Sequence, residues 1–182
     1  MAEPRINGIC RVMDGNTNLR TLKEINTLLT NLNNRKPSII TCFLSGRPTY
    51  TSTSGQEWTK LKISLNTMQS VGSNLVLSNG GIKANKAMKA LVSAQIIHWM
   101  PTATSNEFDI SISRNTLDVS GVVLESHGNM LANLDHHLIS PSVVTLNSGD
   151  TLYLGVVPGA ITSWKAIGDN HATYMTVQEL IT

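Results

Sequence analysis

The chain has 182 residues, a net charge of +2 from 14 basic and 12 acidic side chains, and a hydrophobic fraction of 41%. This length suits one domain with an appendage, and a core of that size is stable without a disulfide framework. The balanced charge, with no run of five Lys or Arg residues, argues against nucleic acid and anionic membranes as partners.

The N-terminal stretch MAEPRINGICRVMDG lacks the apolar run that a secretory signal requires. No apolar segment is long enough to span a bilayer, so we expect no membrane insertion. Cys10 and Cys42 are expected to be free thiols of a reducing compartment, although the sequence leaves their pairing open. We therefore expect a protein made in a cytoplasm.

Residues 21–34, TLKEINTLLTNLNN, carry the signals of a short helix. Thr21 followed by Glu24 fits a capping box. The apolar residues then recur at heptad spacing, at Leu22, Ile25, Leu29 and Leu32. Such a helix is unstable alone in water. Either it packs on its own domain, or it forms a stem in which several chains meet, for which Leu at a and Ile at d favour more than two chains. A third alternative is that no helix forms.

From Ser38 onward the pattern changes to short strands punctuated by Gly, Pro, Ser and Asn. Strands are predicted at 38–44, 58–65, 74–77, 89–100, 107–114, 120–124, 142–146, 151–157 and 172–181. Within 107–114, the polar side chains of Asp109, Ser111 and Ser113 are expected to face solvent. Many short strands with no helix among them predict an all-β sandwich or barrel.

Two predicted strands are apolar on both of their alternating faces. In 89–100 the second apolar face holds Leu91, Ile97 and Trp99, and in 151–157 it holds Tyr153 and Val157. A sandwich strand with one wet face alternates cleanly, so these outer faces require a cover. We expect these five residues to lie in contacts between subunits.

The order of these segments resembles the C1q/TNF-like jelly-roll family, above all its members on phage virions. SIITCFLSG is similar to the first strand of that family, and SGQEWTKLKI to its W-T-K segment. Later segments of that family are similar to four further stretches of this chain, NLVLSNGGIKANKAMKALVSAQI, ISRN, VVTLNSGDTLYLGV and ATYMTVQELI. The resemblance covers about four-fifths of the chain, from Ser38 to Ile181.

The resemblance implies an antiparallel jelly-roll sandwich that forms a homotrimer, and the heptad spacing of residues 21–34 adds a short helical stem before it. It also implies that the Gly-Asp turn at 149–150 reverses one strand into the next, and that Tyr153 lies on the trimer interface. A glycine adopts positive φ freely and an aspartate bonds back to its own backbone, which suits such a turn.

Metal ligands and catalytic motifs are sparse. Asp135, His136 and His137 are weak candidates, because adjacent histidines on an extended chain point to opposite sides. A polar loop or edge strand is the main expectation, and one histidine per chain on a three-fold axis is the alternative. His98, within an apolar strand, is expected to be buried and hydrogen-bonded. No G-x-S-x-G, phosphate-binding, H-E-x-x-H or C-x-x-C motif occurs, so we expect neither an enzyme nor a cofactor.

These observations favour a virion structural protein assembled in a host cytoplasm. Residues 1–37 would bind a capsid or tail protein and form the stem, and 38–182 would form a trimeric head fibre or receptor-binding knob. Arg47, Tyr50 and Glu107 lie in polar loops and are candidates for weak, multivalent binding of a host-surface glycan. Ordinary solvated loops are the main alternative for those three residues.

The alternative function is a cellular surface or secreted ligand-binding module of the same family, such as a spore-surface or signalling protein. Such proteins usually carry a signal sequence, a collagen-like stalk or a membrane anchor, and none is recognised in this sequence. The sequence leaves open whether the virion site is head or tail, and which host receptor is bound.

Overall fold

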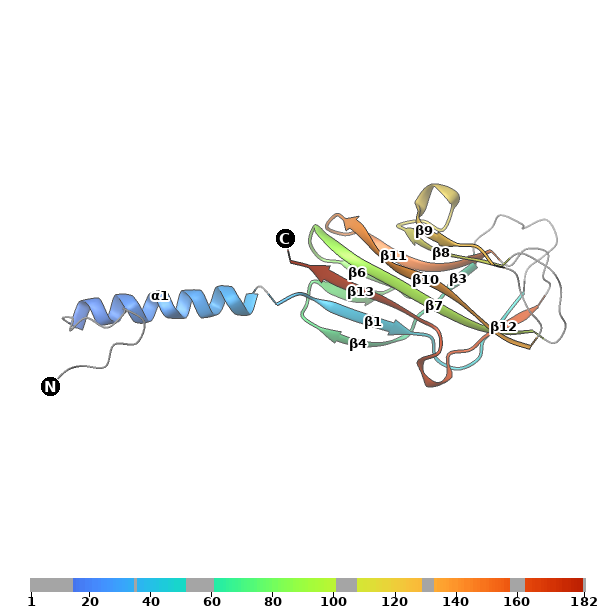
Figure 1. Cartoon of the computed structure of the whole chain (residues 1–182), viewed down its shortest axis with the longest axis horizontal. Helices are drawn as coiled ribbons and strands as arrows, with labels where there is room; N and C mark the ends of the chain where they lie inside the picture. Colours follow the sequence, from blue (N-terminus) through green and yellow to red (C-terminus); the bar gives the residue numbers. More distant parts are fainter. Residues whose placement is uncertain are drawn as a thin grey trace. The chain divides into compact units, whose positions relative to one another are not determined.

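The computed structural model describes residues 15–34, 36–51, 61–100, 108–128, 133–157 and 163–181. The chain divides into two compact units, Met1–Lys36 and Pro37–Thr182. In the described parts of the chain, the first unit contributes a helix and the second unit, which we call the head, contributes the strands (Figure 1). The division falls one residue before the predicted boundary between 1–37 and 38–182.

The helix α1 spans Gly15–Asn34 and is therefore longer than predicted. Thr21 lies inside the helix, so the predicted capping box at Thr21 and Glu24 is wrong. The reason is that Leu19 stands three residues before Leu22 and continues the apolar stripe by one turn toward the N-terminus. Within the helix, the Thr27 hydroxyl donates a hydrogen bond to the carbonyl oxygen of Lys23 at 2.8 Å.

The head consists of two antiparallel sheets. The first, called the β7 sheet, contains β1 (Ile39–Phe43), β2 (Thr49–Tyr50), β4 (Thr67–Val71), β7 (Met88–Met100), β10 (Asn133–Leu146), β12 (Trp164–Ala166) and β13 (Tyr174–Leu180). The second, called the β11 sheet, contains β3 (Leu61–Ile63), β5 (Leu75–Ser78), β6 (Gly81–Ala84), β8 (Asp109–Arg114), β9 (Val122–Ser126) and β11 (Thr151–Val157). Short 3-10 turns lie at Val119–Gly121 and Asp169–His171.

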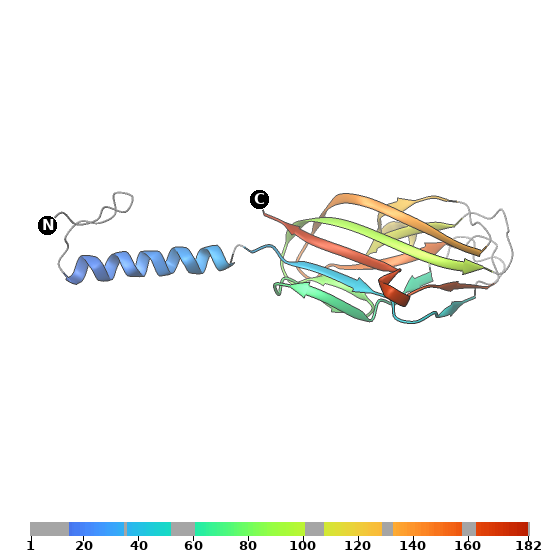
Figure 2. The same cartoon turned by 60° about the horizontal axis from the view of Figure 1, so that its bottom comes forward.

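The strand order places segments that are distant in sequence side by side. The β7 sheet runs β2-β12-β7-β13-β1-β4, and β10 pairs with the other edge of β7. The β11 sheet runs β5-β6-β11-β8-β9, and β3 pairs with β11 beside β6. Figure 2 shows β1, β13, β7 and β10 as neighbouring ribbons of one layer. The predicted all-β antiparallel sandwich is confirmed.

The core lies between the two sheets and is built by alternation along the strands. The inward residues of β7, from Ala90 to Ile96, and those of β11, from Leu152 to Val156, are 1% exposed or less. Phe108 and Trp164 are the largest fully buried side chains. Full burial of each such apolar side chain stabilises the fold by about 1.5–3 kcal/mol.

Several features of the strands differ from the predictions, and the short strands β2, β6 and β12 lie outside every predicted range. The strand β4, TMQSV, was not predicted, because all of its residues are exposed and only pairing with β1 makes it a strand. The serines of β8, Ser111 and Ser113, are fully buried, whereas the alternation predicted solvent exposure. In register, Ser113 lies between Tyr153 of β11 and Val122 of β9, and larger neighbours shield a small side chain.

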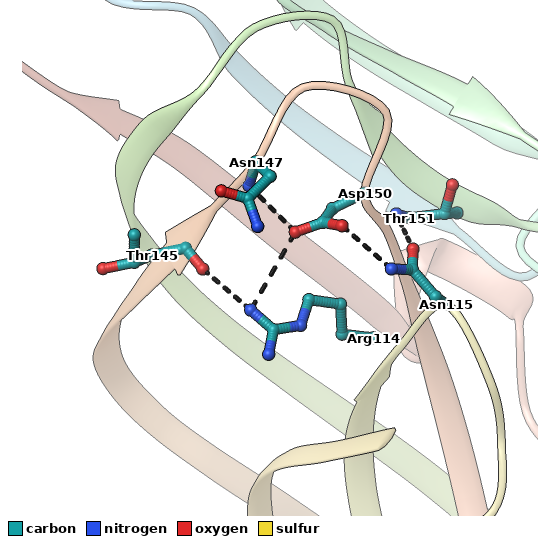
Figure 3. A network of polar contacts seen from close by, with 6 residues as sticks. All are labelled: Arg114, Asn115, Thr145, Asn147, Asp150 and Thr151. Carbon is teal, nitrogen blue, oxygen red and sulfur yellow. Dashed lines mark hydrogen bonds and ion pairs between the residues drawn. The ribbon is translucent and has the colours of Figure 1, made fainter. Parts of the chain in front are cut away.

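The turn between β10 and β11 is held by a buried carboxylate. Asp150 is 7% exposed; its carboxylate accepts hydrogen bonds from the backbone N–H of Asn147 and from the side chain of Asn115, both at 2.8 Å (Figure 3). The Arg114 guanidinium lies 3.9 Å away. Gly149 supplies the left-handed conformation with φ +95°. The side chains of Asp150, Asn115 and Arg114 all stabilise the turn, so the role of this hairpin is structural.

Candidate functional site

The outer face of the β7 sheet carries a row of exposed apolar side chains, which we call the apolar row. Leu134 of β10 is 64% exposed and lies opposite Trp99 of β7, which is 38% exposed. Farther along β10, Leu138 is 49% exposed and Val143 is 59% exposed, the latter opposite half-buried Leu91. Exposed apolar side chains that gather on one face of a sheet make this face a candidate interaction surface.

Polar side chains border the apolar row on the same face. Thr41 of β1 and Thr176 of β13 share a hydrogen bond between their hydroxyl groups at 2.9 Å. Gln178 stands beside Leu91 in the register, and Gln95 donates to the carbonyl oxygen of Ala172 at 2.8 Å. The polar side chains of Thr41, Thr176 and Gln178 therefore lie beside the apolar row on the side of β13 and β1.

The helix α1 also exposes its apolar side chains. Leu22 is 60% exposed, Ile25 43%, Leu28 66% and Leu29 53%. Leu32 lies within the helix, and its side chain is outside the described residues. Most of the stability of a protein helix comes from packing of its apolar face, so we expect this apolar stripe to pack against another apolar surface.

The structure separates the five residues predicted for one interface. Leu91, Ile97 and Trp99 share the outer side of β7, whereas Tyr153 and Val157 belong to β11 in the other sheet. Val157 is only 8% exposed, and the Tyr153 ring lies under the ammonium group of Lys62 at 5.2 Å. Their role in a contact between subunits stays a prediction, and their distribution over two sheets shows that apolar periodicity does not tell which sheet a strand joins.

The apolar row contains residues that the sequence reasoning missed, all on β10. Strand β10 was predicted to begin at Ser142, but it begins at Asn133 and pairs with almost the whole length of β7. The signal was present as the alternation of Leu134, His136 and Leu138, whose side chains share one face of a strand.

A cavity of about 460 Å³ adjoins the apolar row. Its lining residues are Arg47, Trp99, Leu134, Lys165 and Ile167. The Lys165 ammonium lies 5.5 Å from the centre of the Trp99 ring, and Arg47 is ion-paired with Asp169. Two cations beside an indole ring suit an anionic ligand with an apolar face.

The three predicted loop candidates differ in their surroundings. Arg47 is exposed and lines this cavity. Tyr50 instead stacks on Trp164 with ring centres 4.8 Å apart, and burial raises the pKa of its phenol. Glu107 lies outside the described residues. Of the two candidates that the structure describes, Arg47 is the one that lines the cavity.

A buried cluster of ionisable side chains lies between the two sheets. His98 is 0% exposed and His137 is 8% exposed, and their rings lie 5.2 Å apart beside half-buried Asp135. His136, on the same strand, is exposed on the opposite side. The prediction for His98 is corrected in one respect, because neither of its ring nitrogens has a hydrogen-bond partner among the described residues.

Burial dominates the acid–base behaviour of this cluster. The pKa of His98 is lowered to about 4, first by burial and then by the neighbouring His137, while the carboxylate of Asp135 opposes the shift. Burial also lowers the pKa of His137. Both imidazoles are therefore neutral at pH 7, which is the form that binds metal ions.

Comparison with known proteins identifies the fold. No family model matches the sequence, and no curated protein matches it. Among solved structures, murine APRIL at pH 5.0 is similar with a TM-score of 0.57 and 12% identity, over 80% of this chain and 100% of that chain. Eiger TNF from S. frugiperda is similar with a TM-score of 0.55 and 11% identity, over 79% of this chain and 91% of that chain.

The topology and these similarities together define the class: the head is a TNF-like jelly-roll sandwich. At this level of identity the likeness concerns the fold alone. Among the described residues, no helix combines the length and the apolar character that crossing a membrane requires.

Proposed function

We propose that this chain is a non-enzymatic phage virion protein whose homotrimeric head forms a head fibre or receptor-binding knob. The observation that carries the proposal is the apolar row on the outer face of the β7 sheet. The exposed stripe on α1 supports it, because a helix with such a stripe suits a stem of several chains. Residues 1–37 would attach this assembly to a capsid or tail protein.

Self-association follows from the energetics of the apolar row. Burial of apolar surface stabilises an assembly by roughly 25 cal/mol per Å². Leu134, Leu138 and Val143 are each about half exposed or more, so each would contribute on the order of 1 kcal/mol per subunit when covered by a second copy. A cyclic trimer uses this contact three times.

The oligomeric state tests this proposal. Sedimentation of the full chain is expected to yield a mass three times 19.7 kDa. Leu138→Lys, in the middle of the apolar row, is expected to shift the mass toward the monomer, because a lysine cannot be covered by an apolar surface. The matched control is Val119→Lys, since Val119 is 69% exposed and lies on a 3-10 turn away from the row. A wild-type monomer at micromolar concentration would refute the trimer.

Attachment through the N-terminal unit is tested separately. The full chain is expected to co-sediment with purified phage particles, and residues 38–182 alone are expected to fold and trimerise but to stay unbound. Unit 37–182 is compact by itself, which supports the folding of the truncated chain. A truncated chain that still binds particles would contradict the attachment role of 1–37.

The cavity beside the apolar row is our candidate site for host recognition. Arg47 and Lys165 line this cavity without being part of the apolar row, and they would pair with the charged group of an acidic surface glycan. Arg47→Ala is expected to weaken binding of particles to host cells without changing the mass of the trimer. Unchanged binding by that variant would place the receptor site elsewhere.

A second candidate function is a cellular surface or secreted ligand module. The fold likeness to APRIL and to Eiger TNF favours it. Mass spectrometry of purified particles separates the two functions: the chain is expected among the virion proteins in the first case and absent from them in the second.

A further inference from the structure

We propose that His98, Asp135 and His137 form a binding site for a divalent transition-metal ion of the zinc type inside the head. This site goes beyond the proposed virion function, because it is complete within one subunit and does not depend on attachment or on a host receptor.

The pairing of β7 and β10 brings the three side chains together. His98 lies opposite Asp135 in the register, and His137 lies two residues farther along β10 on the same inward side. One potential ligand atom from each residue lies within 4.8 Å of the others. Ligands about 2.0–2.2 Å from one ion stand roughly 3.3 Å apart, so rotations of the side chains close the remaining gap.

The imidazole nitrogens at this place call for a partner. Both ring nitrogens of His98 and the Nε2 of His137 are buried without a hydrogen-bond partner among the described residues. Buried polar atoms are almost always paired, and a histidine can be paired with a metal ion. The Nε2 of His137 lies 3.9 Å from a carboxylate oxygen of Asp135.

The surroundings hold the two rings in place. Phe108 packs on both imidazoles, with ring centres 4.6 Å from His98 and 4.8 Å from His137. Gly128 closes the other side of His137, because a Cβ at this position would lie 2.6 Å from Nδ1. Such supporting contacts fix the orientation of a ligating imidazole.

The ligand chemistry selects the class of metal ion. Two neutral imidazoles and one carboxylate match the donors that Zn²⁺ prefers, with a fourth position left for water. Ca²⁺ and Mg²⁺ prefer sites made of oxygen ligands, so they do not fit. The Asp135 side chain is 18% exposed and connects this buried site with solvent. A bound ion would join β7 to β10, the strand that carries most of the apolar row.

Metal titration of the tag-free full chain tests the proposal. After removal of metal with a chelator, Zn²⁺ is expected to bind at one ion per chain in calorimetry. The melting temperature is expected to rise by roughly 5–10 °C when free Zn²⁺ is about 100 times Kd. No stoichiometric binding and no shift in melting temperature would overturn the proposal.

Three variants locate the ion. Asp135→Asn and His98→Leu are expected to lose the stoichiometric binding and the shift in melting temperature. His136→Ala is the matched control, because it removes the adjacent exposed histidine and is expected to bind as the wild type does. Should His98→Leu fail to fold, Asp135→Asn decides, since Asp135 is only half-buried. Binding kept by Asp135→Asn but lost by His136→Ala would assign the ion to surface histidines and overturn the site.

Discussion

Glu179, near the end of β13, joins the last strand of the head to the place where the chain enters it. Its carboxylate accepts hydrogen bonds at 3.0 Å from the backbone N–H of Ser38 and from the side chain of Asn74. The Lys86 ammonium lies 2.7 Å from the other carboxylate oxygen. The Glu179 side chain is 10% exposed, so these contacts form in a largely desolvated place.

Replacing Glu179 by Ala is expected to lower the free energy of unfolding by about 3 kcal/mol. The N–H of Ser38 is buried, and leaving it without an acceptor costs about 1–3 kcal/mol. Loss of the charge-assisted bond from half-exposed Lys86 adds up to about 1 kcal/mol. Asn74 can turn to water and adds little. For a chain of this length the sum corresponds to a melting temperature lower by roughly 6–12 °C.

The same carboxylate makes stability depend on pH. Burial alone would raise the pKa of Glu179, but the hydrogen bonds from Lys86, Asn74 and Ser38 outweigh it and hold the pKa below 4.5, the ordinary value. A carboxyl group with a lowered folded pKa stabilises the fold above its unfolded pKa, and this contribution is lost as pH falls through the folded pKa. The wild type is therefore expected to lose its advantage over Glu179→Gln at acidic pH.

Thermal unfolding followed by tryptophan fluorescence measures both effects at one fixed protein concentration, since buried Trp164 reports on the head. The matched control is Glu24→Gln, the same chemical change at an exposed position of α1. A decrease below about 2 °C for Glu179→Ala would refute the reasoning. So would a difference between wild type and Glu179→Gln that is the same at pH 7 and below pH 4.

The remaining predictions concern a thiol, two glycines and the turn carboxylate. Burial raises the pKa of the Cys42 thiol to about 12. In a Cys10→Ser variant, Cys42 is therefore expected to resist a thiol reagent at pH 8 until the protein unfolds. Rapid labelling of the folded protein would contradict this. Gly81→Ala is expected to destabilise the head by about 1–3 kcal/mol, because the added Cβ would overlap a backbone carbonyl oxygen of β11. Gly149→Ala has open space around the Cβ but φ +95°, so only backbone strain of about 1–2 kcal/mol is expected, and chemical denaturation compares the two. Asp150→Ala is expected to cost about 1–2 kcal/mol in the same assay, because it removes the acceptor of two part-buried hydrogen bonds, from the N–H of Asn147 and from the side chain of Asn115. An unchanged midpoint would show that water replaces the carboxylate.

Sequence patterns predicted the strands whose own residues alternate or are continuously apolar. Strand β11 was predicted at its observed bounds, and β7 within one residue, because the apolar residues of each strand indicate its burial without reference to any other segment. Strand β4, the first half of β10 and the short strands β2, β6 and β12 were missed. Strand β4 and the first half of β10 are strands because they pair with β1 and β7, and such pairing partners are distant in sequence. The helix was found, but its start was misplaced by six residues.

The candidate sites divide in the same way. The apolar character of the outer side of β7 was predicted from the sequence, because a strand whose two faces are both apolar must be buried on both faces. The separation of Tyr153 from Leu91 did not, because no local pattern states which sheet a strand enters. The histidine cluster was equally hidden: His98 and His137 are far apart in the chain, and only the register of β7 against β10 makes them neighbours.

The amino-acid sequence by itself determined that this chain is an all-β head preceded by a helix. The spacing of apolar residues and the turn residues between segments are local properties of the chain, and they can be read without knowing the fold. The tertiary structure alone decided the neighbours of each strand. Burial, pKa and the placing of apolar side chains on one surface all depend on those neighbours, because they arise from contacts between segments that the chain brings together only when it folds.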